Sequence, residues 1–509
     1  MMQSQGIGFW LSKREVLNPN EDAIIDGNRR LTYRQLNRRV NRLANALAAS
    51  DLKYGDRCAI LAYNCAEYIE LIFASAKLGL ILVPLNWRLS PVELAFNLKD
   101  SGTTHLIFES EFEKMMPELK RQSPLTHCII IGSESVEGAD AYEDLMARQP
   151  EEAPVPTAAV NLETPHIIMY TAGTTGRPKG AVLSQGASFY NTLNLMLDMN
   201  FSSRDRNLSV LPMFHIGGIG LFTLPMIYAG GTVIVQRTFD PAVTLDLLKN
   251  ENITLFFGVA AIFLFLIQHP QFDPTAFNKT RVVMSGGAPL PESLVRQYHE
   301  AGIVLQQGFG MSEAAPSIAT LSRDLALKKA GSIGRPLFHT DARVVDDALN
   351  ILPPETVGEL MIRGPNLLQE YWNRPEATQK AFSNGWFHTG DLARMDSDGD
   401  LYIVDRKKDM FISGGENVYP AEVENAIYEL KEVAETAVIG LKDEKWGEVG
   451  CALVTLKSGN ALSEKEIVEF LKTRLAKFKV PKRVVFVDAL PRNAAGKVLK
   501  NELRNQYQS

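Results

Sequence analysis

Apolar residues recur every three or four positions in the stretch that follows Thr32. The positions that share one face of a helix with about 3.6 residues per turn are Leu36, Val40, Leu43 and Leu47. Thr32 and Gln35 stand before them with the spacing of a capping box, in which each residue satisfies a backbone N–H of the other. The pattern therefore predicts an amphipathic helix that begins next to Thr32.

Short apolar runs alternate with helical segments over most of the chain. The runs that we expect to form buried strands are DRCAILAYN, LILVPLN, HLIFES, CIIIGS, GTVIVQR, TLFFGV and RVVMSGG. A helix through AEYIELIFASAKLG separates the first two runs, and further helical segments separate the later ones. Strands that alternate with helices form mainly parallel sheets covered on both faces, so the chain is predicted to have an α/β fold.

The pattern changes after Gly364. The stretch GDLARMDSDGDLYIVDR predicts a hairpin with Asp398-Gly399 at its turn. A Gly-rich loop and a helix follow, and the remaining chain is typical of a small, Lys-rich α+β domain. We place the boundary near Lys408, which predicts an N-terminal domain over residues 1–407 and a C-terminal domain over 408–509.

Two stretches do not have the function that they first suggest. The uncharged run Ile216–Val235 is long enough for a membrane span, but several Gly and one Pro interrupt it, which favours a buried helix, a turn and a buried strand. The run DSDGD does not match a calcium-binding EF-hand loop, because Leu401 and Lys407 stand where that loop has Gly and Glu. A solvated turn is expected there.

Composition narrows the classes of function. The 509 residues are too many for one ordinary core, and a net charge of -6 argues against a general nucleic-acid binder. The chain has four cysteines, which are Cys58, Cys65, Cys128 and Cys451. None has C-x-x-C spacing, and the N-terminus lacks a secretory pattern, so we expect a cytoplasmic protein. No basic amphipathic helix stands out, which leaves only peripheral membrane attachment open, and no oligomeric state is indicated.

The segment YTAGTTGRPKG, Tyr170–Gly180, directly follows an apolar run. It does not fit the Walker pattern. Its glycines, however, allow the backbone to approach a ligand closely and to present successive N–H groups to an anion. Its threonine hydroxyls add hydrogen-bond donors and Lys179 adds a positive charge. These residue types favour a phosphate-binding loop over an ordinary turn.

Five motifs, in this order, resemble those of the adenylate-forming superfamily of acyl-CoA synthetases, peptide-synthetase adenylation domains and beetle luciferases. They are TAGTTGRPKG (171–180), QGFGMSE (307–313), WFHTGDL (386–392), DRKKDMFISGGENVYPAEVE (405–424) and PRNAAGK (491–497). The resemblance covers nearly the whole chain and is strongest to bacterial fatty-acyl-CoA and aryl-CoA synthetases. It implies a large N-terminal domain of flavodoxin-like α/β subdomains with a small β-barrel-like subdomain, and a small mobile C-terminal domain.

The resemblance also implies an ATP-dependent carboxylic acid–CoA ligase with two half-reactions. A carboxylate attacks the α-phosphate of ATP, which gives an acyl-adenylate and pyrophosphate, and the thiol of coenzyme A then displaces AMP. Each half-reaction depends more on stabilising charge than on proton transfer. The implied ligands are ATP, Mg²⁺, coenzyme A and a small-molecule carboxylic acid. A non-catalytic scaffold is disfavoured, because the lysines, acids and arginine of these motifs are all retained.

Site residues are carried over by resemblance. The residues that would bind ATP are Thr171, Gly173, Thr174, Thr175, Gly176, Gly286, Gly287, Ala288, Gly308, Phe309, Gly310, Ser312, Asp391, Ile403 and Arg406. The catalytic residues would be Lys179, His215, Glu313 and Lys497. Glu313 would bind Mg²⁺, because hard cations prefer oxygen ligands, and Asp391 would accept hydrogen bonds from the ribose. Lys497 would bridge the attacking carboxylate and the α-phosphate.

The mobile domain and the acyl pocket have their own candidates. Lys408 matches the hinge, and Gly414 and Gly415 would line the channel for coenzyme A. The acyl pocket would be formed by His215, Gly217, Gly308, Ala314 and Pro316. Because PMFHIGG has no carboxylate for a substrate amine, we expect a medium- or long-chain fatty acid, with an aryl acid such as 4-coumarate, ferulate or benzoate as the alternative. A further alternative is an acyl-AMP ligase that loads a carrier protein.

Overall fold

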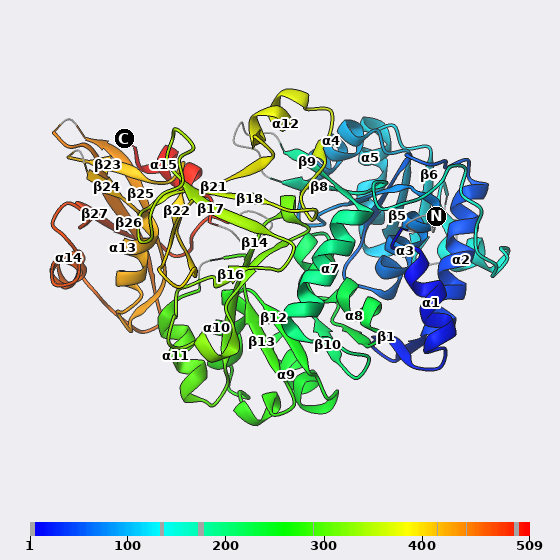
Figure 1. Cartoon of the computed structure of the whole chain (residues 1–509), viewed down its shortest axis with the longest axis horizontal. Coiled ribbons are helices and arrows are strands. Elements are labelled where there is room, and N and C mark those ends of the chain that lie inside the picture. The colour runs from blue at the N-terminus through cyan, green and yellow to red at the C-terminus, as the bar shows by residue number, and fades with distance from the viewer. Residues whose placement is uncertain are drawn as a thin grey trace.

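A computed structural model describes residues 6–132, 137–171, 178–288, 290–414, 416–443, 445–492 and 498–508. Two large sheets with their helices form the N-terminal part, an antiparallel sheet lies beside them, and the C-terminal sheet forms one end of the molecule (Figure 1). The predicted α/β class, with a large N-terminal part and a small C-terminal domain, is confirmed.

The eight-stranded sheet is mostly parallel. Its strands in spatial order are β19 (Glu370–Tyr371), β9 (Lys179–Ser184), β8 (Pro165–Thr171), β4 (Ile81–Pro84), β3 (Arg57–Leu61), β5 (His105–Glu109), β6 (His127–Ile131) and β7 (Asp140–Ala141). The pairs from β8 to β7 are parallel, whereas β9 pairs antiparallel with both β8 and β19. The edge strand β19 is important for the site described below.

The nine-stranded sheet has a parallel centre and antiparallel edges. Its strands in spatial order are β16 (Arg335–Pro336), β15 (Ser317–Thr320), β14 (Leu305–Gly310), β13 (Val282–Ser285), β12 (Leu255–Gly258), β10 (Arg206–Ser209), β11 (Thr232–Val235), β1 (Asp22–Asp26) and β2 (Arg29–Thr32). The strands from β14 to β1 are parallel neighbours. Residues 216–235 form a π-helix (Gly217–Leu221), helix α8 (Thr223–Ala229) and β11, so the predicted buried helix and strand are confirmed.

Two smaller sheets complete the chain. The antiparallel sheet contains β17 (Asp341–Val345), β18 (Gly358–Arg363), β20 (Phe382–Ser383), β21 (Trp386–Met395) and β22 (Leu401–Arg406), and it occupies the place expected for the barrel-like subdomain. The C-terminal sheet contains β23 (Phe411–Ser413), β24 (Glu416–Val418), β25 (Val433–Asp443), β26 (Gly447–Leu456) and β27 (Arg483–Phe486).

The helices predicted after Thr32, through AEYIELIFASAKLG and after the Gly-rich loop are present as α2 (Tyr33–Ala49), α3 (Ala66–Leu78) and α13 (Pro420–Ile427). The other helices of the described residues are α1 (Phe9–Leu17), α4 (Pro91–Ser101), α5 (Met116–Gln122), α6 (Tyr142–Ala147), α7 (Gln185–Met199), α8, α9 (Pro241–Asn250), α10 (Ala260–Gln268), α11 (Glu292–Glu300), α12 (Pro375–Ala381), α14 (Glu464–Lys472) and α15 (Lys500–Tyr507). The capping box at Thr32 is formed, with Gln35 accepting from the Thr32 N–H at 2.9 Å.

The hairpin between β21 and β22 confirms the predicted turn at Gly399, but the turn is not simply solvated. The Lys329 ammonium lies between three carboxylates, at 2.9 Å from Asp396, 2.8 Å from Asp398 and 2.6 Å from Asp400. Asp400 is buried. A protein cation therefore occupies the centre of this acidic turn.

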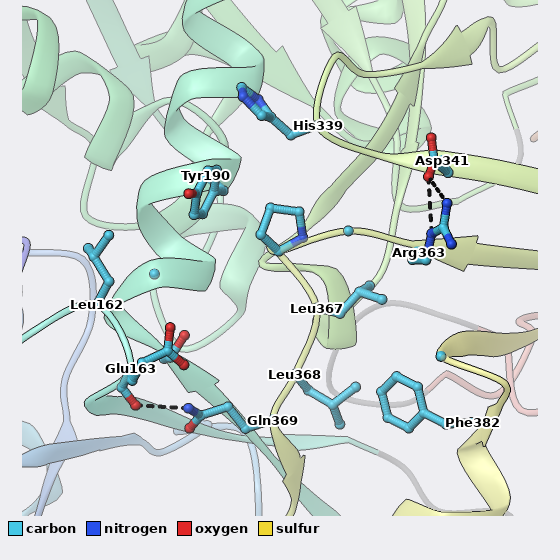
Figure 2. Close-up of a pocket in the computed structure, with 15 residues that line it drawn as sticks. Leu162, Glu163, Tyr190, His339, Asp341, Arg363, Leu367, Leu368, Gln369 and Phe382 are labelled. Atoms are coloured by element: carbon cyan, nitrogen blue, oxygen red, sulfur yellow. Dashed lines mark hydrogen bonds and ion pairs between the residues drawn. The ribbon is translucent and has the colours of Figure 1, made fainter.

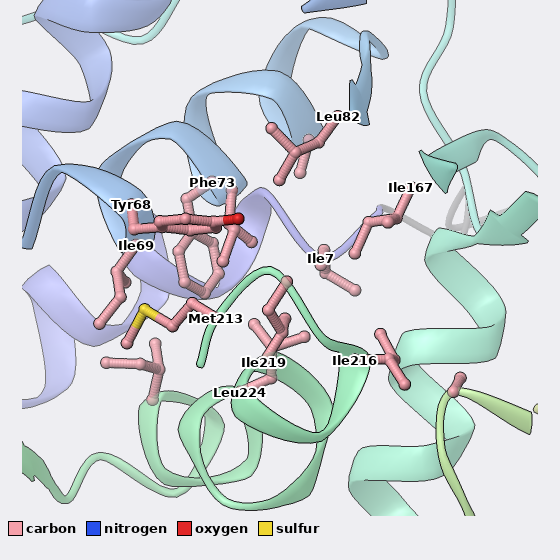
Figure 3. Close-up of a cluster of buried hydrophobic side chains, with 14 of the residues drawn as sticks. Ile7, Tyr68, Ile69, Phe73, Leu82, Ile167, Met213, Ile216, Ile219 and Leu224 are labelled. Carbon is pink, nitrogen blue, oxygen red and sulfur yellow. The ribbon is translucent and has the colours of Figure 1, made fainter. Parts of the chain in front are cut away.

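A buried apolar cluster joins the two large sheets. Figure 3 shows Tyr68 and Phe73 of α3 facing Met213 and Ile219, with Ile167 of β8 at the side. Burial of such side chains stabilises the fold by about 1.5–3 kcal/mol each. The loop that carries His215 is thereby anchored between the sheets. None of the helices in the described ranges combines the length and the apolar character that a membrane crossing requires.

Candidate active site

The predicted phosphate loop connects two paired strands. Thr171 ends β8 and Lys179 begins β9, and the two residues are direct partners in the antiparallel ladder. Four of the predicted ATP-binding residues, Gly173, Thr174, Thr175 and Gly176, lie outside the described residues. The described flanks place Lys179 at the start of β9, beside the end of β8.

Glu313 lies in a short 3₁₀ turn, Ser312–Ala314, that follows β14. Its backbone carbonyl accepts a hydrogen bond from the Leu368 N–H at 2.7 Å. The side-chain amide of Asn366 donates to the carbonyls of Ala314 and Ser317, both at 2.9 Å. The segment from Asn366 onward therefore supports the turn from behind and fixes the buried Glu313 side chain.

The backbone of this turn is also strained at one residue. Ala315 adopts a φ of 61°, a left-handed conformation that is unusual for a residue with a Cβ. Such conformations persist where surrounding contacts enforce them, and they gather at binding and catalytic sites. The outlier therefore supports a functional interpretation of residues 312–316.

Tyr371 of β19 connects Lys179 to Glu313. Its hydroxyl donates a hydrogen bond of 3.0 Å to Glu313 Oε1, and the Lys179 ammonium lies 5.5 Å from the centre of its ring. Two predicted catalytic residues from distant parts of the sequence are thus brought to one side chain that the sequence did not single out.

The electrostatic environment of Glu313 is set mainly by burial. Burial raises the pKa of the Glu313 carboxyl above its ordinary value, because the charged form loses hydration. Its own backbone N–H, the Tyr371 hydroxyl and the charge of Arg406 oppose this rise in pKa, whereas Asp391 adds to it. Burial, followed by the negative charge of Glu313, likewise raises the pKa of the Tyr371 phenol. Glu313, Asp391 and Arg406 therefore lie within electrostatic reach of one another.

Asp391 and Arg406 form an ion pair within the site. They are direct partners on the antiparallel strands β21 and β22, and Arg406 Nε lies 2.6 Å from Asp391 Oδ1. Asp391 is 2% exposed. Ile403, the other predicted residue of β22, pairs with Ala393 and packs against the core.

The glycines predicted near the adenine come close together. A Cβ on Gly286 would lie 2.7 Å from the Gly308 carbonyl oxygen, and a Cβ on Gly310 would lie 2.1 Å from the Pro316 oxygen. Neither position has room for a larger residue, so glycine is required by close backbone approach. Gly287 has a φ of 79°, Ala288 follows it, and the Phe309 ring is partly buried against the core.

The segments predicted for the acyl pocket are also in contact. His215 precedes the π-helix Gly217–Leu221, and such helices are frequent at functional sites. A Cβ on Gly220 would lie 2.5 Å from the Ala315 oxygen, so this helix packs against the 314–317 segment. The Ser317 hydroxyl is buried, with no hydrogen-bond partner among the described residues.

The C-terminal candidates are described only in part. Gly414 has a φ of 62°, and a Cβ there would lie 2.8 Å from the Trp446 ring. Lys408 is exposed in a turn between β22 and β23. Gly415 and Lys497 lie outside the described residues.

A cavity of about 630 Å³ lies behind the supporting segment rather than at these residues. Figure 2 shows Tyr190 and His339 on one side of it, Leu368 and Phe382 on another, and the paired Asp341 and Arg363 on its wall. None of the predicted site residues within the described ranges lines it. It is therefore separate from the candidate active site.

The site fits ATP and Mg²⁺ in its chemistry. Glu313 supplies carboxylate oxygens, the ligands that Mg²⁺ prefers, and the Asp391–Arg406 pair offers an acceptor and a donor to the ribose hydroxyls. Lys179 supplies a cation for phosphate, and Gly287, where an added Cβ would meet only Val259 at 3.8 Å, leaves the backbone open for a flat base. The side chains described around Glu313 include no thiolate or imidazole that would favour a softer metal.

Sequence reasoning missed two groups. Tyr371 stands in EYWNRPEAT, and no spacing signals its contact with Glu313, which is 58 residues away. The Arg88 guanidinium lies 4.8 Å from the Trp87 ring and 5.7 Å from the Phe214 ring, directly before His215. Its position follows from packing between the loop after β4 and the loop after β10, which local sequence does not encode.

Known families match both parts of the chain. Residues 12–372 match the AMP-binding enzyme family, and residues 422–497 match the AMP-binding enzyme C-terminal domain.

Three known proteins show the range of relatives. The chain is 41% identical to a feruloyl-CoA synthase of Amycolatopsis over 99% of this chain and 100% of that protein. It is 39% identical to a long-chain-fatty-acid–CoA ligase of Mycobacterium tuberculosis over 99% of each chain. Its structure is similar to o-succinylbenzoate coenzyme A synthetase from Bacillus subtilis in complex with ATP and magnesium, with a TM-score of 0.87, 34% identity and coverage of 98% of this chain and 99% of that chain.

Proposed function

Because the chain belongs to the AMP-binding enzyme family and is an ATP-dependent acyl- or aryl-CoA synthetase, we propose that its preferred substrate is an aryl acid with an oxygen substituent. The observation that carries this proposal is the unpartnered hydroxyl of Ser317, 3% exposed and next to Pro316 of the predicted acyl pocket. Burial of a hydroxyl without a hydrogen-bond partner costs about 1–3 kcal/mol. A hydroxyl or methoxy oxygen of the substrate can bond to the Ser317 hydroxyl and offset this cost, whereas an alkyl chain cannot. The feruloyl-CoA synthase relative supports the same class.

A fatty acid is the second candidate. The long-chain-fatty-acid–CoA ligase is a relative of nearly equal identity. Ile216 and Ile219, which lie beside the glycines of the π-helix, belong to the same buried apolar cluster as Met213 (Figure 3). An extended chain directed into that cluster would be recognised by apolar contact alone. Loading of a carrier protein remains the third candidate.

In the proposed first half-reaction, Lys179 and the loop before it bind the β- and γ-phosphates, and Asp391 and Arg406 bind the ribose. Glu313 would hold Mg²⁺, which when bound would neutralise charge on the phosphates. The attacking carboxylate and the α-phosphate are both anionic, so Lys497 between them lowers the barrier electrostatically. His215 stands between the acyl group and the thiol channel.

In the proposed second half-reaction, the C-terminal domain turns at Lys408, and Gly414 and Gly415 line the path of coenzyme A. One hydrogen bond joins the chain on the two sides of this position. Asp405, before the hinge, accepts a hydrogen bond of 2.8 Å from the Ala421 N–H, after the hinge. This bond crosses the proposed hinge and would have to open when the domain turns.

The substrate class is tested by AMP release with Mg-ATP and acetate, octanoate, palmitate, benzoate, 4-coumarate or ferulate, with and without coenzyme A. We expect coenzyme A-dependent AMP release that is greatest with the oxygenated aryl acids. Ser317→Ala is expected to lower kcat/KM for ferulate about tenfold and to leave octanoate unchanged. Greater turnover of octanoate or palmitate would favour the fatty-acid candidate, and pyrophosphate release without any effect of coenzyme A would favour the carrier-protein candidate.

Asp391→Asn is expected to raise KM for ATP about 10- to 100-fold, because hydrogen bonds to a charged group are worth about 1.5–3 kcal/mol. The amide keeps the shape of the side chain but weakens its pairing with Arg406. The measurement is initial velocity against ATP concentration at saturating acid and coenzyme A. Asp341→Asn, which weakens the exposed pair with Arg363, is the control and should leave KM for ATP unchanged.

A further inference from the structure

We infer that Tyr371 is a positioning residue of the nucleotide site, which holds the Glu313 carboxylate in the orientation that receives the divalent cation and supports Lys179 with its ring. The inference rests on the proposed roles of Glu313 and Lys179. It adds a residue that none of the motifs contains.

The position of Tyr371 follows from its strand. β19 adds to the edge of the eight-stranded sheet, where Tyr371 pairs with Ala181. The backbone fixes this register, because Trp372 N–H donates to the Gly180 oxygen at 2.7 Å and Gln369 N–H donates to the Val182 oxygen at 2.8 Å. Lys179 stands two residues before Ala181 and so shares its face of the strand. The Tyr371 ring therefore lies diagonally opposite Lys179, which agrees with the distance of 5.5 Å.

The hydroxyl of Tyr371 faces the Glu313 turn. Its hydrogen bond of 3.0 Å reaches only Oε1. A carboxylate offers about four acceptor positions on two oxygens, so this bond fixes its rotation without using its capacity for a cation. Partners of this kind, which hold a metal ligand from behind, commonly affect metal affinity about 10- to 100-fold.

The same segment also holds the backbone of the turn. Leu368 N–H donates to the Glu313 carbonyl. The Asn366 side chain donates to the carbonyls of Ala314 and Ser317. Tyr371 is thus the side-chain end of a brace, residues 366–371, whose other hydrogen bonds named above go to backbone carbonyls of the turn. Its hydroxyl contacts the Glu313 carboxylate, and its ring lies 5.5 Å from the Lys179 ammonium.

The chain offers a matched control at the far edge of the same sheet. The Tyr142 hydroxyl, next to β7, donates a hydrogen bond of 2.7 Å to Glu70 Oε2. β7 and β19 are the two edge strands, so Tyr142→Phe removes the same kind of bond away from the nucleotide. Tyr371→Phe keeps the ring under Lys179, whereas Tyr371→Leu removes both the hydroxyl and the ring.

The test measures binding without turnover. Free Mn²⁺ is followed by electron paramagnetic resonance in the presence of protein and an ATP analogue that cannot be cleaved between the α- and β-phosphates, without acid. Tyr371→Phe is expected to weaken Mn²⁺ binding about tenfold. Metal-free affinity for the analogue is expected to stay unchanged in Tyr371→Phe and to fall about threefold in Tyr371→Leu. Melting curves check that each variant is folded.

The outcomes separate the inference from the proposed function. If Glu313→Gln weakens Mn²⁺ binding and Tyr371→Phe does not, the inference is wrong and the role of Glu313 stands. Equal weakening in Tyr371→Phe and Tyr142→Phe would also overturn it, because the effect would then be general destabilisation. If Glu313→Gln itself leaves Mn²⁺ binding unchanged, the proposed role of Glu313 fails and the inference falls with it.

Discussion

Glu313→Gln is expected to slow acyl-adenylate formation by about 100- to 1,000-fold, with a higher requirement for Mg²⁺. Glutamine preserves the size of the side chain and can still accept the Tyr371 hydrogen bond, so the turn of residues 312–314 should be retained. What is lost is a negative charge in a buried place, where the surroundings screen it weakly. Pyrophosphate formed in a single turnover, measured by rapid quench at several Mg²⁺ concentrations, tests this expectation.

Glu70→Gln is the matched control for this substitution. Glu70 is also buried, also accepts a hydrogen bond from a tyrosine hydroxyl and pairs with Arg39, but it lies on α3 away from the nucleotide residues. We expect a lower melting temperature and an unchanged dependence on Mg²⁺. If Glu313→Gln forms pyrophosphate at the wild-type rate, or if both variants lose the same activity, Glu313 does not have the proposed role.

The regular parts of the fold were predictable because the signals are local. The helix after Thr32 has both its apolar face and its capping box within a few residues, and the strands β3, β4, β5, β6, β11, β12 and β13 form from the short apolar runs that predicted them. The order of those strands was not predictable from any one segment. β1 pairs with β11 and β4 pairs with β8, and such contacts depend on the packing of distant helices.

The candidate site likewise has contacts that the sequence predicts and contacts that it does not. Asp391 and Arg406 were identified from separate motifs, and the hairpin between them makes their pairing predictable. The contacts of Glu313 with Tyr371 and of Lys179 with the same ring arise because a two-residue edge strand, β19, joins the sheet. So short an element has no periodicity to detect. The buried Ser317 hydroxyl was equally invisible, because serine in a sequence does not indicate whether its oxygen is paired.

The segment proposed to carry the central cation is anchored to the C-terminal domain. Arg492 and Val498, which flank residues 493–497, form an antiparallel bridge, and Leu499 N–H donates to the Pro491 oxygen at 2.8 Å. In the following helix α15, Lys500 lies 2.7 Å from Glu424 and Arg504 lies 2.8 Å from Asp409. These pairs bind the segment to the domain beside the proposed hinge. Delivery of Lys497 to the nucleotide therefore depends on how that domain is turned.

Lys497→Ala is accordingly expected to separate the two half-reactions. Adenylation should slow by about 100- to 1,000-fold, since a charge contact of this kind is worth about 3–4 kcal/mol in the barrier. Formation of the thioester from supplied acyl-adenylate and coenzyme A should stay within about threefold of the wild-type rate, because the lysine has then withdrawn with its domain. Lys465→Ala, at an exposed lysine of α14 in the same domain, is the control and should change neither rate. Equal losses in both half-reactions would mean that Lys497 supports the domain as a whole rather than the attack on the α-phosphate.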